Sequence, residues 1–302
     1  MAFHYRIYGL LLHSEIPIPE LEPIENSQFD IVCRVGDISR PLVNRMENNW
    51  FLKISDQSFL VRVDNTALFN IKNGTTIIIT PLGQKQATDD RIRLYLTGPI
   101  LNGLLHQRHR LIFHGSCIGL SQKCFMIAGP SGAGKSTLSA AFLKDNEYYL
   151  LSDDAGVISF TDQGIPMIWP SFSRIKLMPG TMKMLNIPVE GTMTIPHEKG
   201  KQSVPVPCRA DTDRTLLDHI FILQETDTAT LHLHRVTGIK KIEALLSNTY
   251  WIDDLAMMGG TEFHFAQCSK VARSCHVTLV NYNKTFHPPE KIISQMKRCG
   301  AS

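Results

Sequence analysis

The residues 129–137 read GPSGAGKST, and this is the segment of the sequence whose residue types and spacing point most directly to chemistry. Gly129, Gly134, Lys135 and Ser136 occupy the defining positions of the pattern G-x-x-x-x-G-K-[S/T]. Glycines let the backbone N–H groups of such a loop surround phosphate, the lysine reaches the outer phosphates, and the hydroxyl binds Mg²⁺. We therefore predict a site for a nucleoside triphosphate with Mg²⁺. The residues expected to form it are Gly129, Pro130, Ser131, Gly132, Ala133, Gly134, Lys135, Ser136 and Thr137.

Two adjacent carboxylates follow the loop. Asp153 and Asp154 end the strand-like run YYLLS and lie 18 and 19 positions after Lys135. In phosphate-loop proteins a neighbouring strand carries an acidic residue to the metal. We expect one carboxylate near Mg²⁺ and the other near an acceptor hydroxyl. The alternative for one of them is a turn-capping role at the start of AGVISF.

These residues lie in the second of two differently patterned regions. Short segments rich in β-branched and aromatic residues dominate the start of the chain, and Asn73-Gly74 predicts a hairpin turn. We expect a β-rich domain over residues 1–88 and an α/β phosphate-loop domain over 89–302. Within the latter, helical spacing begins near Pro99, HIFILQE and TLHLHRV are expected to be neighbouring strands, and PPEKIISQMKRC is expected to form the last helix.

The bulk composition excludes several classes of function. The 302 residues are 43% hydrophobic and 20% charged, with a net charge of +3, which does not favour a nucleic-acid partner. No apolar run approaches the length of a membrane helix, and the start of the chain lacks a signal-peptide pattern. The seven cysteines show no metal-ligand spacing and are expected to be reduced and mostly buried. The expected location is the cytoplasm.

FHGSCIGL, GPSGAGKST and LLSDDAGVI, taken in order, resemble the catalytic domain of bacterial HPr serine kinase/phosphorylase. The resemblance covers about residues 113–158 and implies an HPr-kinase/PEP-carboxykinase-like fold that uses ATP and Mg²⁺. It places His114 near the transferred phosphate. It also implies that one aspartate is the base toward a serine hydroxyl and the other holds metal; we expect Asp153 as base, and Asp154 with Ser136 at the metal.

A second resemblance extends over more of the chain. YRIYGLLLHSEIPIPEL, the β-rich region and the stretch P-S-F-x-R-x-K-L are similar to HPr-kinase-related proteins encoded with lasso peptide biosynthesis genes, a class of ribosomally synthesised, modified peptides. This resemblance implies phosphorylation of the C-terminal serine of a precursor peptide. The glycine-rich stretch linked to phosphorylase activity has no match, and WPSFSRIKLMPG stands in its place.

Several basic residues could contact phosphate or a peptide carboxylate. Arg174 and Lys176 would share one face of a strand, and Lys199 or Lys201 could supply a cation near the terminal phosphate. Solvent-facing side chains are the alternative for all four.

Together these features predict a serine kinase acting on a peptide, with a possible homo-oligomer. The β-rich region could bind the peptide along an exposed strand edge. An HPr-type protein serine kinase, a nucleotide-hydrolysing switch or ATPase, a small-molecule kinase and a non-catalytic nucleotide-dependent module stay open as alternatives.

Overall fold

A computed structural model describes residues 2–25, 28–47, 49–195, 200–206, 213–250 and 260–300. These described residues form a mixed α/β protein with three sheets and two compact units. The first unit runs to Arg110 and also takes in Gly260 and Thr261, and the second begins at Leu111. Each unit is described by itself.

The first unit is built on a seven-stranded sheet, in keeping with the β-rich pattern of its sequence. Its strand order is β1-β2-β3-β7-β6-β5-β4. The strands are β1 (Phe3–Ile7), β2 (Leu10–Ser14), β3 (Ile31–Val35), β4 (Phe51–Ser55), β5 (Ser58–Val63), β6 (Ala67–Lys72) and β7 (Thr76–Pro81). The predicted hairpin turn joins β6 to β7, because Asn73 and Gly74 both adopt positive φ, 54° and 61°. Helix α1 (Arg40–Arg45) packs Leu42 and Val43 onto the sheet.

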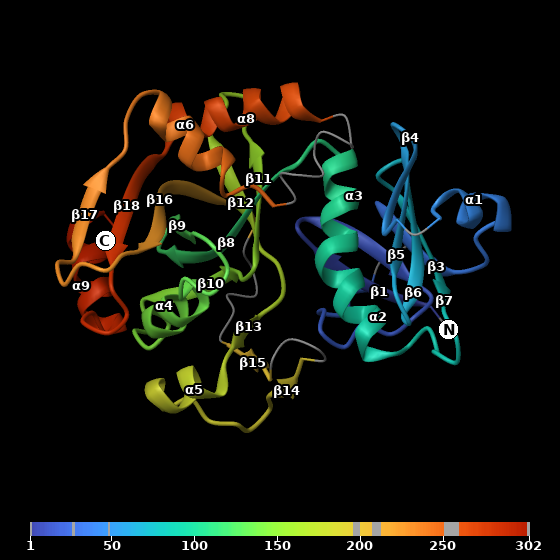
Figure 1. The fold of residues 1–302 in the computed structure, drawn as a ribbon, viewed down its shortest axis with the longest axis horizontal. Coiled ribbons are helices and arrows are strands. Elements are labelled where there is room, and N and C mark those ends of the chain that lie inside the picture. The colour runs from blue at the N-terminus through green and yellow to red at the C-terminus, as the bar shows by residue number, and fades with distance from the viewer. Residues whose placement is uncertain are drawn as a thin grey trace. The chain divides into compact units, whose positions relative to one another are not determined.

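A helical segment with a kink at Gly98 completes the first unit on the other side of this sheet (Figure 1). It consists of α2 (Asp90–Tyr95), a π-helical turn η1 (Leu96–Ile100) and α3 (Leu101–Gln107). Helical structure therefore begins at Asp90 and not near Pro99, because the Asp89 carboxylate caps the helix by accepting from the N–H of Arg91 at 3.0 Å. The π-helical turn accommodates Pro99.

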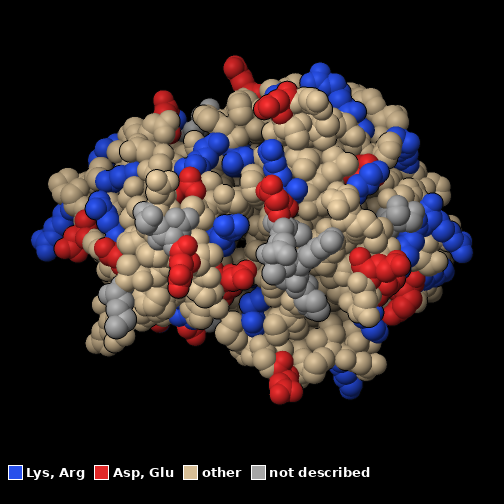
Figure 2. Space-filling view, turned by 180° about the vertical axis from the view of Figure 1, so that it is seen from behind, with Lys and Arg blue, Asp and Glu red and all other residues tan. Residues whose placement is uncertain are grey.

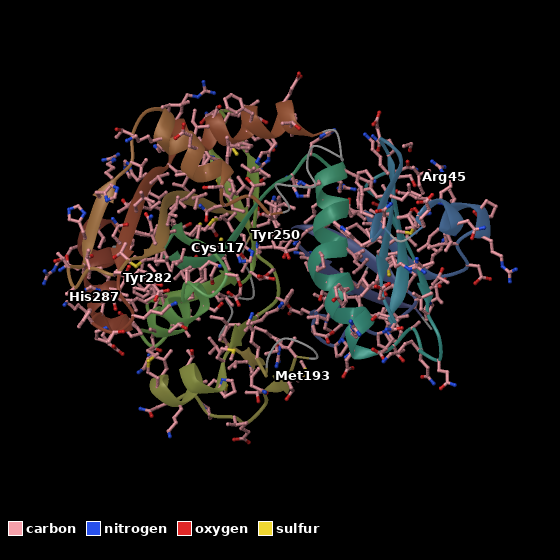
Figure 3. The ribbon with its side chains drawn as sticks, viewed as in Figure 1. Arg45, Cys117, Met193, Tyr250, Tyr282 and His287 are labelled. Atoms are coloured by element: carbon pink, nitrogen blue, oxygen red, sulfur yellow. The ribbon has the colours of Figure 1, made fainter. Side chains whose placement is uncertain are left out.

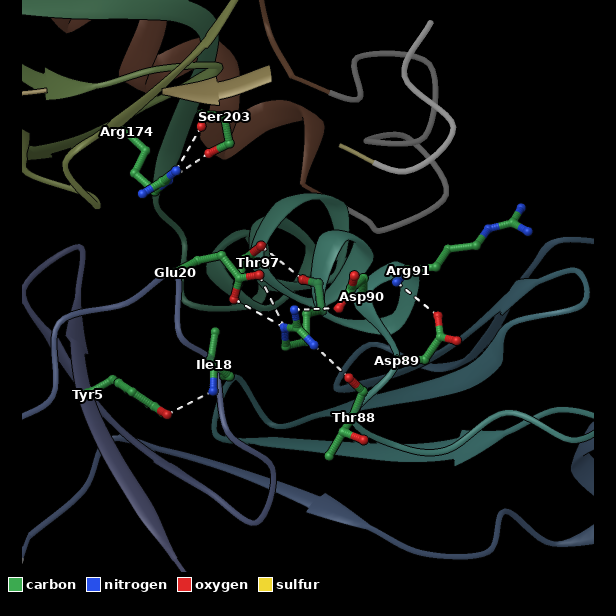
Figure 4. Close-up of polar contacts among 11 residues, drawn as sticks. Tyr5, Ile18, Glu20, Thr88, Asp89, Asp90, Arg91, Thr97, Arg174 and Ser203 are labelled. Atoms are coloured by element: carbon green, nitrogen blue, oxygen red, sulfur yellow. Dashed lines mark hydrogen bonds and ion pairs between the residues drawn. The ribbon is translucent and has the colours of Figure 1, made fainter. Parts of the chain in front are cut away.

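The helical segment explains why the compact units divide after Arg110 and not after residue 88. The side chain of Gln107 accepts from the N–H of Gly74 at 2.7 Å, and Arg108 donates to the carbonyl of Gly74 at 2.9 Å. At the other end of the segment, the Arg93 guanidinium binds the carboxylates of Glu20 and Asp90 (Figure 4). These bonds hold the segment to the first unit.

The second unit contains an eight-stranded mixed sheet. Its central strands β9, β16 and β18 are parallel, and β8 runs antiparallel to β9. The strands are β8 (Leu111–Leu120), β9 (Lys123–Ala128), β10 (Tyr148–Ser152), β11 (Ala155–Phe160), β12 (Pro166–Trp169), β16 (Thr215–Glu225), β17 (His232–Arg235) and β18 (His276–Tyr282). The expectation that HIFILQE and TLHLHRV are neighbours is wrong: β18 pairs with both β16 and β17 and separates them.

Helices cover both faces of this sheet (Figure 1). Phe125 and Ile127 of β9 belong to one core, which includes residues of α4 (Lys135–Phe142) and of the predicted last helix α9 (Pro289–Cys299). Cys124 and Met126 belong to the other, with residues of α6 (Ile239–Leu246) and α8 (Thr261–Ser274). Alternate side chains of β9 therefore pack into the two cores on opposite faces of the sheet. The parallel strands and the phosphate-loop helix are held by packing on both sides.

A small sheet borders the second unit's larger one. It has the order β13-β15-β14, formed by β13 (Arg174–Leu177), β14 (Met193–Thr194) and β15 (Gln202–Pro205). Helix α5 (Pro179–Leu185) follows β13 and meets α4 where the hydroxyls of Thr137 and Thr181 lie 3.2 Å apart. Strand β13 is thereby held beside the start of α4.

Charged side chains of both signs and mostly buried thiols characterise the described residues. Lysine, arginine, aspartate and glutamate side chains are interspersed over the face in Figure 2. No helix among the described residues is long and apolar enough to cross a membrane. The six described cysteines are free thiols, five of them buried, and the described residues contain no cluster of three or more histidine, cysteine or acidic side chains able to hold a metal.

Candidate phosphate-loop active site

The loop of residues 129–134 connects β9 to α4, so the order strand, loop, helix that the motif requires is present. Gly129, Gly132 and Gly134 have φ values of 139°, 82° and 88°, a region that favours glycine. A Cβ atom on Gly129 would lie 2.8 Å from the carbonyl oxygen of Leu223 in β16. Glycine is therefore required at residue 129 both by backbone angle and by the neighbouring strand.

Tyr282 supports the loop from the end of β18. Its hydroxyl donates to the carbonyl of Ala133, and burial raises the pKa of this phenol to about 12. The side chain lies in the second unit's core (Figure 3). Sequence reasoning missed this residue, although an aromatic at the end of the apolar run VTLVNY was the available signal.

Lys135 is the first residue of α4, and its amine lies over the first half of the loop. The Nζ atom donates to the carbonyls of Gly129 at 2.9 Å and Pro130 at 3.0 Å. Burial lowers the pKa of this amine to about 8, against the opposing effect of Asp154 and Asp153. The lysine is therefore a poorly solvated cation that an anionic ligand would stabilise.

Asp153 lies against the predicted metal ligand Ser136. The Ser136 hydroxyl donates to the Asp153 carboxylate at 3.1 Å, and the backbone N–H of Lys176 donates to the same carboxylate at 2.9 Å. Burial raises the pKa of Asp153, while the bond from Lys176 opposes that effect. The sequence interpretation paired Ser136 with Asp154. The structure pairs it with Asp153, because successive residues at the end of β10 point in different directions.

Asp154 faces several basic side chains. Its carboxylate lies 3.5 Å from Nζ of Lys176 and 3.8 Å from Nδ1 of His114. Burial alone would raise the pKa of Asp154, but Lys176, His114, Lys201 and Lys135 together lower it. Its backbone has a φ of 75°, uncommon for a residue other than glycine, and this turn separates its direction from that of Asp153. Asp154 is ionised at neutral pH.

His114 lies in β8 directly opposite Ala155 of β11, which brings it next to Asp154. Its ring stacks on that of Tyr250, with centroids 5.6 Å apart. Burial and the charge of Lys135 lower the pKa of His114, with Asp154 opposing. The imidazole is therefore neutral near pH 7. Tyr250, labelled in Figure 3, is a second residue that sequence reasoning missed.

The other predicted basic residues divide into two groups. Lys176 and Lys201 act on the site: both help to lower the pKa of Asp154. Arg174 shares the half-buried face of β13 with Lys176, but its guanidinium binds Ser203 of β15 through the side chain at 2.7 Å and the carbonyl at 2.7 Å (Figure 4). Those bonds hold β13 to β15. Lys199 lies outside the described residues.

The donor set beside the loop suits Mg²⁺. Ser136 Oγ and the Asp153 carboxylate are hard oxygen donors in direct contact, and Mg²⁺ is bound in proteins by one or two carboxylates together with phosphate oxygens and water. The buried Asp153 carboxylate accepts hydrogen bonds from the Ser136 hydroxyl and the Lys176 backbone N–H, and a divalent ion would offset its charge. The residues present therefore fit this metal.

Comparison with known proteins gives limited guidance. No protein-family model matches the chain, and no curated protein matches it. Among solved structures, the chain is similar to the HPr(Ser) kinase/phosphatase from Coxiella burnetii. That match has 11% sequence identity and a TM-score of 0.31, and covers 63% of this chain and 99% of the other. At this TM-score the similarity carries no functional conclusion. The function is therefore inferred from the geometry of the site.

Proposed function

We propose that the protein is an ATP- and Mg²⁺-dependent kinase that phosphorylates a serine hydroxyl of a peptide. The observation that carries the proposal is the separation of two adjacent carboxylates beside one phosphate loop. Asp153 contacts the metal-binding hydroxyl of Ser136, whereas Asp154 contacts His114 and Lys176. A nucleotide-hydrolysing ATPase would use the second carboxylate to orient water, and the experiment below separates the two activities. A kinase needs one to orient its acceptor hydroxyl.

The first half of the site would hold ATP. Backbone N–H groups of the loop and the positive start of α4 would surround the phosphates, and the Lys135 amine would move from the loop's carbonyls to the outer phosphate oxygens. Mg²⁺, when bound, would neutralise charge on the phosphates. Ser136, as expected, and Asp153 would hold it, which exchanges the roles that the sequence predicted for the two aspartates.

The second half of the site would hold the acceptor. The serine O–H would donate its hydrogen bond to Asp154, and its oxygen would attack the γ-phosphorus in line. As that P–O bond forms, the bond from phosphorus to the ADP oxygen breaks, and the hydroxyl proton passes to Asp154. An ionised carboxylate of lowered pKa is a weak base, so Asp154 would act chiefly by orienting the hydroxyl.

The cations around Asp154 have a separate task. Lys135, Lys176 and Lys201 all influence the pKa of Asp154, so their charges converge on one region. A transferring phosphoryl group carries negative charge over its equatorial oxygens, which these lysines would stabilise. The same cations keep Asp154 ionised until the hydroxyl arrives.

For the substrate, we propose the C-terminal serine of a lasso peptide precursor. The support is the sequence resemblance over YRIYGLLLHSEIPIPEL and P-S-F-x-R-x-K-L, together with a seven-stranded sheet in the first unit whose end strands, β1 and β4, could pair with an extended peptide. HPr-type protein phosphorylation and a nucleotide-dependent switch are the alternatives that the following experiment separates.

The test is incubation of the purified protein with Mg²⁺ and ATP labelled on the γ-phosphate, with a precursor-like peptide ending in serine or in alanine. We expect label on the serine peptide alone, located at the terminal residue by mass spectrometry. Release of labelled inorganic phosphate with unlabelled peptide would show an ATPase and contradict the kinase. Transfer to HPr in place of the peptide would retain the kinase and replace the substrate.

A further inference from the structure

A cleft of about 800 Å³ opens beside the phosphate loop, entirely within the second unit. That volume lies in the range of about 300–1,000 Å³ typical of ligand sites. One side is formed by His114 and by Gly129, Pro130 and Ser131 of the loop. The rest of the lining comes from the end of β16, from Leu279 of β18, and from Ala244 and residues 247–250. Ser136, Asp153 and Asp154 do not line it, but His114 does, and His114 lies 3.8 Å from the Asp154 carboxylate. The cleft therefore adjoins the Asp154 side of the site through His114.

The contacts of Lys135 show which end of a nucleotide this cleft would meet. The lysine of a phosphate loop reaches the β- and γ-phosphates. Here its amine lies at the carbonyls of Gly129 and Pro130, the same residues that border the cleft. The terminal phosphate would therefore lie at the mouth of the cleft. The rest of the nucleotide would extend away from it, past Ser136 and Thr137.

The wall around Tyr250 is fixed in place before any ligand binds. The N–H of His114 donates to the carbonyl of Asn248 at 2.8 Å, and the N–H of Tyr250 donates to the carbonyl of Ile112 at 3.0 Å. Thr249 is buried between them and its hydroxyl lies 2.8 Å from Nε2 of His264 in α8. Segment 248–250 is thus bound to β8 and α8, and the Tyr250 ring is held against His114.

The described lining of the cleft is close to electrically neutral. It contains no lysine or arginine, and its one acidic residue, Glu225, is paired with Lys284. The lowered pKa of His114 leaves that residue uncharged near pH 7. The remainder is largely apolar or amide and hydroxyl surface, including Leu223, Ala244 and Leu279. Such a surface disfavours acidic side chains in the segment next to the serine, because their charge would lose its hydration without gaining a partner.

We propose that this cleft is the acceptor site, and that it binds an uncharged, partly apolar peptide segment whose serine hydroxyl reaches Asp154 past His114. This inference rests on the proposed kinase function and deepens it by giving the chemistry of the residues next to the serine. Two observations carry it. The cleft is lined by residues 129–131 of the phosphate loop and by His114, which contacts Asp154, and the described lining is close to neutral.

Ser247 allows a direct test. It lies exposed at the end of α6 and lines the cleft, so Ser247→Trp would fill the cleft without disturbing the core. Ser274→Trp is the matched control, because Ser274 is also exposed at the end of a helix. It precedes β18, at the opposite end of the parallel strands from the phosphate loop.

Kinase activity is measured on two sets of single-serine hexapeptides, one with alanine and leucine beside the serine and one with aspartate and glutamate. ADP·Mg²⁺ affinity is measured by calorimetry. We expect the wild-type protein to prefer the apolar set. Ser247→Trp should raise the KM for that set about tenfold or more, which is about 1.4 kcal/mol, with ADP·Mg²⁺ affinity unchanged. Ser274→Trp should match the wild type.

Other outcomes would overturn the proposal in different ways. Weaker ADP·Mg²⁺ binding by Ser247→Trp would assign the cleft to the nucleotide, and equal use of both peptide sets would remove the claim of a neutral acceptor. Absence of transfer to any peptide by the wild-type protein would instead contradict the kinase function itself. If Ser247→Trp does not fold, Ser247→Glu replaces it; this variant should lose the apolar set and gain arginine-flanked peptides.

Discussion

Asp153 and Asp154 are neighbours in sequence with opposite electrostatic surroundings. The first is buried against the Ser136 hydroxyl with a raised pKa, and the second faces lysines and a histidine that lower its pKa. Environment assigns different roles to chemically identical groups. The pairing of Asp153 with Ser136 favours Asp153 for the metal and Asp154 for the acceptor.

Replacing each aspartate by asparagine should therefore give different losses. Asp154→Asn should lower the rate of phosphoryl transfer about 10²–10⁴-fold and leave ADP·Mg²⁺ affinity near that of the wild type. Asp153→Asn should weaken the Mg²⁺ dependence of nucleotide binding. Calorimetry at several Mg²⁺ concentrations, with steady-state kinetics, separates the two effects. The reverse result would restore the assignment of Asp153 as base.

Lys176 makes the site's pH dependence testable. Its charge is the largest of the effects that lower the pKa of Asp154, against burial, which raises it. In Lys176→Gln the pKa of Asp154 should rise, so the carboxylate becomes protonated at a higher pH. The acidic limb of the pH profile of kcat/KM should shift upward in pH.

Lys183→Gln, at an exposed position of α5, is the control for that profile and should not move it. Because folding lowers the pKa of Asp154, its ionised form also stabilises the fold. That stability is fully present above the pKa of the unfolded state and is lost as the pH falls through the pKa of the folded state. An acidic limb that stays in place in Lys176→Gln would remove Asp154 from the rate-determining ionisation.

At the scale of elements, the phosphate loop depends on the strand next to it. Gly129→Ala would place a Cβ 2.8 Å from the Leu223 carbonyl and force a non-glycine residue to a φ of 139°. We expect a loss of roughly 1–3 kcal/mol in unfolding free energy, with loss of ATP binding. Chemical denaturation and calorimetry measure both.

Gly132→Ala separates the cost of the backbone angle from the cost of the contact with β16. Gly132 also has a positive φ, 82°, but its Cβ would meet nothing within 4 Å. This variant should show only the backbone cost, roughly 1–2 kcal/mol. Equal losses in the two variants would mean that contact with β16 does not constrain the loop.

Local elements were predictable where one segment carries its own signals. The run from β8 through the loop to α4, the turn at Asn73-Gly74 and helix α9 all follow the sequence pattern. The position of β18 between β16 and β17 did not follow from the sequence pattern. A parallel pairing joins strands far apart in the chain, so no local sequence signal indicates which strands are neighbours. Tyr282 ends a visible apolar run, but tertiary contacts alone bring it to the loop, as they bring Tyr250 to His114.

At the scale of the whole molecule, the division after Arg110 changes where the chain can be cut. A fragment beginning at Leu111 should bind ADP·Mg²⁺ with an affinity close to that of the full chain. A fragment beginning at Asp89 should retain the helical segment without its sheet and expose Leu96, Ile100 and Leu104, which are buried in the full chain. It should bind a hydrophobic dye such as ANS strongly.

Calorimetry and dye fluorescence on the two fragments test this prediction together. Strong dye binding by the fragment that begins at Leu111, and none by the one that begins at Asp89, would return the boundary to residue 88. If the fragment beginning at Leu111 also phosphorylates the precursor-like peptide with an unchanged KM, the proposed peptide-binding role of the first unit would be wrong.

The place of β18 in the sheet has a consequence for how the protein is made. Residues 276–282 supply the strand beside β16 and the hydroxyl that supports the Ala133 carbonyl. The phosphate loop at residues 129–134 leaves the ribosome far earlier, when that partner has not yet been translated. The nascent chain therefore cannot complete its nucleotide site until residues 276–282 have emerged from the ribosome, nearly 150 residues after the loop itself.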